Sequence, residues 1–255
     1  MLVTYKNPGF QYSIDSILLF QEDETAPYWS DSLYSVYPQL SKEAMAGFMK
    51  DEKKEYLIRE LKSVWDCLAD ELDRKVVLYN SQFGKYHEQI EDALSDAFET
   101  DTRTIFNDLT ANICLNPISP RFLEERYFDV FYLNSERGAL GMSLHEIIHY
   151  IWFYVWNNHF GDSYSEYETP SLKWILSEMV VEGIMSDERL ASINPYYPGC
   201  GYSYFQDMII QGKPILDTLY EMYQGNRITG YMETAYRYCL ENETAIRQHI
   251  SEAEK

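Results

Sequence analysis

Two histidines and a glutamate at residues 145–149 are the side chains most able to do chemistry in this chain. The segment reads HExxH, with His145 and His149 four residues apart and Glu146 directly after the first, and it lies inside the apolar run 144–156. On a helix, residues four apart share one face, so the two imidazoles could hold one metal ion between them. The carboxylate of Glu146 would then lie beside the metal, where it could take a proton from a water molecule. The spacing predicts a metal site with a general base.

The motif is uncommon for a chain of this composition. With 5 His among 255 residues, composition alone would place an HExxH somewhere in about 1% of such chains. The competing interpretation is a helical scaffold with a chance motif, in which both histidines pack in the core and hydrogen-bond to their neighbours. That interpretation predicts no stoichiometric metal.

The segment resembles the zinc-binding helix of the zincin metallopeptidases. Catalytic zinc usually takes three protein ligands and one water, and the third ligand distinguishes the branches of this superfamily. The metzincin pattern continues HExxHxxGxxH, whereas this chain has Trp152 at the glycine position and Val155 at the last histidine position. The resemblance is therefore to the gluzincin branch, in which a glutamate on a second, downstream helix is the third ligand. It is confined to residues 138–186.

Four glutamates downstream of the motif are candidates for the third ligand. Glu166 and Glu168 lie in a polar connection before Pro170, and Glu168 has the spacing of aminopeptidase-type gluzincins but lies outside the expected helix. Glu178 and Glu182 lie inside that helix, four apart on one face. The face is otherwise apolar, and carboxylates on a buried face are costly unless they are paired or bind a metal.

We prefer Glu182 as the third ligand, because Glu182-Gly183 matches the point at which a glycine often follows the ligand in the gluzincin helix. Glu178 would then accept a hydrogen bond from a ligating imidazole and fix its tautomer. Thermolysin-like gluzincins have the reverse order, which would make Glu178 the ligand and Glu182 its support. The resemblance thus implies Zn²⁺ bound by His145, His149 and Glu182, with Glu178 as the alternative ligand.

The resemblance further implies a zinc-dependent metallopeptidase that acts on a peptide or protein substrate. Glu146 would be the general base for a zinc-activated water that attacks a peptide bond. The oxyanion would need a second donor, and the candidates are Tyr202, Tyr204, Tyr231 and Tyr236. The alternative is a non-catalytic zincin-like protein that binds a metal or a peptide. The intact Glu146 favours catalysis, because a binding protein needs no general base.

Charge and composition argue against several other classes of protein. The formal net charge is −20, which argues against nucleic acid and anionic membrane surfaces as partners because both require Lys and Arg. An acidic balance is typical of solubility, although cationic peptides would also fit it. Residues 1–8 lack the charged start and apolar core of a signal peptide, so we expect a cytoplasmic protein. Without any CxxC, we expect the four cysteines to be buried free thiols: Cys67, Cys114, Cys200 and Cys239.

The hydrophobic pattern predicts mainly helices, which must position the motif. Residues 1–40 read as irregular structure with short elements. A helical pattern runs over 41–97, with a second amphipathic piece at 87–98. The motif helix is apolar on most faces and should be buried in the centre of a domain. Short strands are expected at 104–106, 111–115 and 127–133, and further helices from Pro170, at 203–223 and at 230–250.

These elements predict an α+β fold that is mainly α. We expect a helical N-terminal part over residues 1–100 and a zincin-like core over 101–255, joined in one compact unit. In that core a small sheet would pack on the HExxH helix, and the C-terminal half would be helical.

Overall fold

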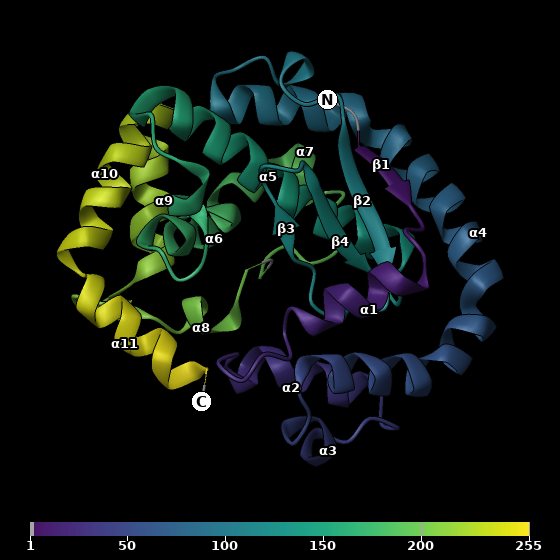
Figure 1. The fold of residues 1–255 in the computed structure, drawn as a ribbon. Helices are drawn as coiled ribbons and strands as arrows, with labels where there is room; N and C mark the ends of the chain where they lie inside the picture. Colours follow the sequence, from purple (N-terminus) through teal and green to yellow (C-terminus); the bar gives the residue numbers. More distant parts are fainter. Residues whose placement is uncertain (1–2, 200, 255) are drawn as a thin grey trace. The chain divides into compact units, whose positions relative to one another are not determined.

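The computed structural model describes residues 3–199 and 201–254 and is mainly helical, with one four-stranded and one two-stranded sheet (Figure 1). The predicted class, α+β and mainly α, is confirmed. The wider zincin-like core stays a prediction.

The chain forms two compact units. We call them the sheet unit, residues 3–82, 109–139 and 254, and the motif unit, residues 83–108 and 140–253. Each unit is assembled from separate stretches of the chain, whereas the sequence led us to expect a boundary near residue 100.

The four-stranded sheet belongs to the sheet unit. Its strand order is β1-β2-β4-β3, in which the first two pairings are parallel and β3 is antiparallel to β4. The strands predicted at 111–115 and 127–133 are confirmed as β2 and β4. The strands run as follows: β1 Val3–Lys6, β2 Leu109–Cys114, β3 Arg121–Phe122 and β4 Tyr127–Phe131.

Three helices precede the long helix in the sheet unit, and the first two lie within residues 1–40, where the sequence indicated irregular structure with short elements. They are α1 Phe10–Leu18, α2 Pro27–Val36 and α3 Lys42–Ala46. Pro27 at the first turn of α2 suits a helix start because its missing N–H needs no partner there. In α1 two serines are buried beside the apolar residues, which weakens the apolar periodicity that would have indicated a helix.

A buried aspartate ties α1 to the sheet. Asp129 on β4 is fully buried and accepts hydrogen bonds from the hydroxyls of Ser16 and Tyr12, the latter at 2.6 Å. Asn112 on β2 donates to the Tyr12 oxygen at 2.9 Å. Burial raises the pKa of Asp129, and the hydroxyl donors oppose that rise. The hydroxyls of Tyr12 and Ser16 in α1 are thus hydrogen-bonded to the sheet.

The helical pattern predicted over 41–97 is divided between α3 and α4, and α4 runs without a break from Lys50 to Phe98, so that it includes the second piece predicted at 87–98. Its last part lies in the motif unit. There Gln89 donates to the carbonyl of Arg189 at 2.6 Å, and the Arg189 guanidinium pairs with Asp96 at 2.8 Å. These contacts join the end of α4 to the short helix α7, Glu188–Ala191.

The motif unit is helical apart from one short hairpin. The strand expected at 104–106 is wrong: Thr102–Thr104 form a 3-10 turn (η1) because the side chain of Asp101 caps it. The bounds of the other elements are α5 Glu136–Phe160, η2 Tyr164–Tyr167, α6 Leu172–Met185, α7 Glu188–Ala191, α8 Ser203–Gln206, β5 Ile209–Ile210, β6 Lys213–Pro214, α9 Ile215–Gly225, α10 Ile228–Glu241 and α11 Glu243–Ala253.

The two long C-terminal helices expected at 203–223 and 230–250 are interrupted. Gln211 and Gly212, with φ of 53° and 80°, form the two-residue turn between β5 and β6. Positive φ at both central residues is the geometry of a tight hairpin turn, so the helix predicted over 203–223 breaks there. The second predicted helix is divided at Asn242 into α10 and α11.

The cysteines are only partly as expected. Cys114 and Cys239 are buried free thiols, whereas Cys67 is an exposed free thiol. Cys200 lies outside the described residues.

Candidate metal centre

Helix α5 carries the HExxH motif in a buried position, as predicted. Exposure is 9% for His145, 3% for Glu146 and 0% for His149. The helix begins at Glu136, so Gly141 lies inside it.

The helices of residues 3–199 and 201–254 were also compared with the length and hydrophobicity that a membrane span requires, and none of them meets both requirements.

Gly141 allows a loop to approach α5 one turn before the first histidine. A Cβ at this position would lie 2.4 Å from Asn194 Oδ1 and 2.9 Å from the ring of Tyr196. Asn194 is buried, and its Oδ1 already accepts a hydrogen bond from the backbone N–H of Tyr196 at 2.9 Å. Because Gly141 and His145 are four apart, the loop packs on the same face of α5 as the histidines.

Helix α6 follows Pro170, as predicted, and carries the buried carboxylate of Glu178. Its start is capped by Ser171, whose hydroxyl accepts from the N–H of Trp174 at 3.0 Å, a strong start signal. The helix packs against α9 and α10. Its residue Glu178 is 1% exposed although it carries an ionisable side chain.

Three atoms from these two helices converge in one place. The Nε2 atoms of His145 and His149 are 3.0 Å apart. Oε2 of Glu178 lies 3.2 Å from Nε2 of His145 and 3.3 Å from Nε2 of His149. All three side chains are buried, and the group has the composition and spacing to hold a metal ion.

Hydrogen bonds alone do not satisfy all three atoms of the triangle formed by the two Nε2 atoms and Oε2 of Glu178. The three edges are nearly equal, so an N–H aimed at one corner points about 60° away from the other, beyond useful hydrogen-bond geometry. If both Nε2 atoms carry protons, two donors face each other at 3.0 Å. If only one does, the other imidazole lone pair faces a carboxylate oxygen at 3.2–3.3 Å. A cation, by contrast, attracts all three atoms at once.

The triangle also has the size expected around zinc. Two atoms bonded to one tetrahedral zinc ion, each at about 2.0–2.1 Å, lie about 3.3–3.4 Å apart. The three observed separations, 3.0, 3.2 and 3.3 Å, are close to that edge length. Two imidazoles and one carboxylate leave the fourth position open, as catalytic zinc sites do. The residues present therefore fit a zinc ion.

Glu182, the ligand preferred from the sequence, is not part of this group. Its Oε1 accepts a hydrogen bond from the backbone N–H of Gly199 at 2.8 Å, and its side chain lines a pocket. The alternative ligand, Glu178, is the one that meets both imidazoles. The two glutamates share a face of α6 but lie one turn apart, about 6 Å along the helix, and only the first is level with the histidines.

The other glutamates considered from the sequence lie at the surface. Glu166 is exposed, caps the 3-10 turn η2 through Ser163 and pairs with Lys173 at 2.6 Å. The Lys173 partner holds the pKa of Glu166 below its ordinary value. Glu168 is exposed at the end of η2.

The candidate oxyanion donors are scattered over the motif unit. The ring of Tyr236 packs against Trp156 at 5.3 Å between centroids, and Tyr202 and Tyr204 stack on each other at 5.3 Å. Tyr231 is fully buried and lines the same pocket as Glu182. None of these contacts assigns an oxyanion donor.

Comparisons with protein-family models, curated proteins and solved structures return no match to this chain.

The close approach at Gly141 yields a stability prediction. We expect Gly141→Ala to lower the free energy of unfolding by about 1–2 kcal/mol, because the overpacking penalty exceeds the gain in helix propensity. Urea denaturation measures this. The matched control is Gly84→Ala in α4, where an added Cβ meets no atom within 4 Å; this variant should be as stable as the wild type or more stable by about 0.5–1 kcal/mol. A Gly141→Ala variant as stable as Gly84→Ala would contradict the described packing.

Proposed function

We propose that this chain is a zinc-dependent metallopeptidase of gluzincin type, with His145, His149 and Glu178 as the metal ligands and Glu146 as the general base. The observation that carries the proposal is the convergence of two imidazole nitrogens and one carboxylate oxygen at 3.0–3.3 Å in a buried position. Burying a carboxylate costs several kcal/mol unless it is compensated, and a shared cation provides that compensation.

The chemistry would divide between the metal and Glu146. A zinc ion at this site supplies Lewis acidity, which lowers the pKa of a water molecule and polarises a peptide carbonyl. Glu146 follows His145 directly in α5 and is buried, and the HExxH spacing would put its carboxylate beside a metal held by the two histidines. It accepts the proton of the attacking water and delivers it to the leaving amine. The buried surroundings keep bulk water from competing for that proton.

The identity of the metal depends on more than the ligands. Two histidines and one carboxylate also suit iron(II). What favours zinc is the spacing on α5, which places a general base next to the first ligand. Hydrolysis uses such a base, so a hydrolytic zinc site accounts for all four residues.

Two alternatives make different predictions. A non-catalytic zincin-like protein would bind the metal through the same ligands but hydrolyse no peptide. A helical scaffold with a chance motif would bind no metal and would have to satisfy the Nε2 atoms of His145 and His149 with protons, which their triangle with Glu178 disfavours. The first alternative is separated by activity and the second by metal content.

Metal content distinguishes the two candidate glutamates. We expect elemental analysis of the purified protein to find about one zinc per chain. Glu178→Gln, which keeps the size of the side chain, should weaken zinc binding by more than the roughly 10–100-fold cost of losing a supporting hydrogen bond. Glu182→Gln, one turn further along the same helix, is the matched control and should retain the zinc.

Three outcomes would contradict this assignment. Zinc lost in Glu182→Gln but kept in Glu178→Gln would restore Glu182 as the ligand. Iron in place of zinc would exclude the proposed metal. An absence of metal from the wild type after reconstitution would favour the helical scaffold.

Glu146→Gln tests the general base. The variant should retain its zinc but lose peptidase activity, with kcat reduced by about 10²–10⁴-fold because the attacking water keeps its proton. Cleavage of a fluorogenic peptide mixture, with metal content measured on the same samples, provides the readout. Glu136→Gln, an exposed position on the same helix, should leave kcat unchanged. Equal activity of Glu146→Gln and the wild type would exclude this role for Glu146.

A further inference from the structure

The loop that follows α7 approaches both helices of the candidate metal centre. Its residue Asn194 lies against α5, where Oδ1 would be 2.4 Å from a Cβ added at Gly141, one turn before His145. Further along the loop, a Cβ added at Gly201 would be 3.6 Å from the backbone oxygen of Glu178 in α6. The loop therefore borders the centre on each of the two helices that carry its ligands.

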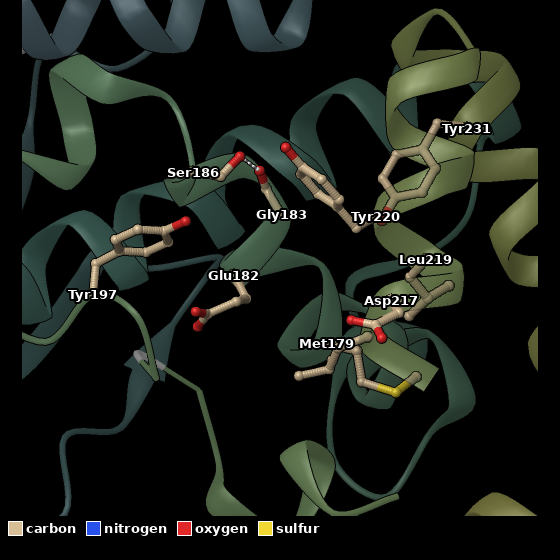
Figure 2. A pocket seen from close by; sticks show the side chains of 10 residues that line it. Met179, Glu182, Gly183, Ser186, Tyr197, Asp217, Leu219, Tyr220 and Tyr231 are labelled. Atoms are coloured by element: carbon tan, nitrogen blue, oxygen red, sulfur yellow. Dashed lines mark hydrogen bonds between the residues drawn. The ribbon is translucent and has the colours of Figure 1, made fainter. Parts of the chain in front are cut away.

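A further contact holds the same loop on α6. The backbone N–H of Gly199 donates a hydrogen bond to Oε1 of Glu182 at 2.8 Å. Glu182 and the loop residue Tyr197 also line one pocket, in which Figure 2 shows both side chains. Glu182 follows Glu178 by one helical turn, so this bond fixes the loop close to the centre although Glu182 is not one of the converging ligands.

Asn194 carries a buried hydrogen-bond donor that the protein does not use. The residue is 3% exposed. Its Oδ1 accepts a hydrogen bond from the backbone N–H of Tyr196 at 2.9 Å, which settles which end of the amide is the oxygen. Among the described residues, Nδ2 of Asn194 has no hydrogen-bond partner. A buried donor without a partner is destabilising, so this amide gains from a bound molecule that offers an acceptor.

The exposure of the candidate ligands indicates from which side the centre can be reached. The side chain of His145 is 11% exposed, whereas those of His149 and Glu178 are fully buried. A molecule from solvent therefore reaches the centre past His145. Side chains on an α-helix lean toward its N-terminus, so the ring of His145 lies over the turn that contains Gly141. The amide of Asn194 packs on that same turn, beside the accessible side of the centre.

We propose that Nδ2 of Asn194 donates a hydrogen bond to the carbonyl oxygen of the peptide bond that is cleaved. The proposal rests on the proposed peptidase function. As the water oxygen bonds to the carbonyl carbon, its proton goes to Glu146 and the π electron pair of the C=O bond moves to the oxygen. When that pair returns, the C–N bond breaks and the proton passes from Glu146 to the nitrogen. A fixed N–H stabilises the negative oxygen more than the neutral carbonyl.

A purely structural role for Asn194 makes a different prediction. In that role only Oδ1 matters, because it holds the turn at Tyr196. Asn194→Asp and Asn194→Ser both keep an oxygen that can accept this N–H, and both lack the amide NH₂ group; the serine variant also adds no charge. The structural role therefore predicts that both variants behave as the wild type, whereas the donor role predicts a selective loss of transition-state binding.

Binding of a transition-state mimic tests the donor without requiring turnover. The probe is the tightest-binding member of a phosphinic hexapeptide library selected on the zinc-loaded wild type, because a phosphinate has the two oxygens of the tetrahedral species. We expect calorimetry to show about 10²–10³-fold weaker binding of this probe by both Asn194 variants, the loss typical of one oxyanion donor. The parent peptide of the same sequence, measured with Glu146→Gln also present, should bind almost as tightly as before.

Controls separate this loss from effects on folding, metal content and charge. Urea denaturation and zinc analysis are run on each variant, and Asn194→Ser decides the result if the charge of Asn194→Asp alters the zinc content. Asn226→Asp makes the same change of charge at an exposed position of the motif unit and should leave the affinity for the phosphinic peptide unchanged.

The outcomes separate this proposal from the proposed function. Unchanged affinity of Asn194→Ser for the phosphinic peptide, in a protein whose wild type cleaves peptides, would overturn the donor and leave the peptidase standing. Equal weakening of the phosphinic and parent peptides would also overturn the donor, and so would a zinc-loaded wild type that binds no library member. A selective loss in the Asn194 variants, with no cleavage by the wild type, would support the donor and refute the peptidase.

Discussion

The motif unit depends on one electrostatic constraint, the approach of two imidazole nitrogens and a carboxylate oxygen to one another inside a buried region. Two of these atoms can share a proton at 3.0–3.3 Å, but the third then faces a lone pair, and a shared cation would relieve that contact. The surrounding structure fixes this approach. The loop at Asn194 packs on Gly141 of α5, Ser171 sets the start of α6, and α9 and α10 pack against α6. A site held from several sides can keep its ligands in place before the metal arrives.

Four residues of spacing give the two glutamates of α6 different surroundings. Glu178 is level with the histidines, and Glu182 faces the pocket one turn later. In the proposed enzyme only the first of the two glutamates holds the metal.

The sequence predicts which side chains share a face of one helix, but it does not predict how two helices pack against each other. His145 and His149 share a face because four residues make about one helical turn, so their pairing could be read from spacing alone. Glu178 and Glu182 satisfy the same local rule equally well. The choice between them depends on how far α6 is shifted along α5, which the side chains of many residues decide together. The hairpin turn at Gln211 was also missed, because a non-glycine residue with positive φ gives little signal in a sequence.

The central claim is that His145, His149 and Glu178 bind one zinc ion. X-ray absorption at the zinc edge, on zinc-loaded protein, tests it most directly because it reports the atoms around the metal. The account predicts only nitrogen and oxygen neighbours at about 2.0–2.1 Å, with the outer-shell signal of two imidazoles. Sulfur at about 2.3 Å, or a shell without imidazole, would contradict it.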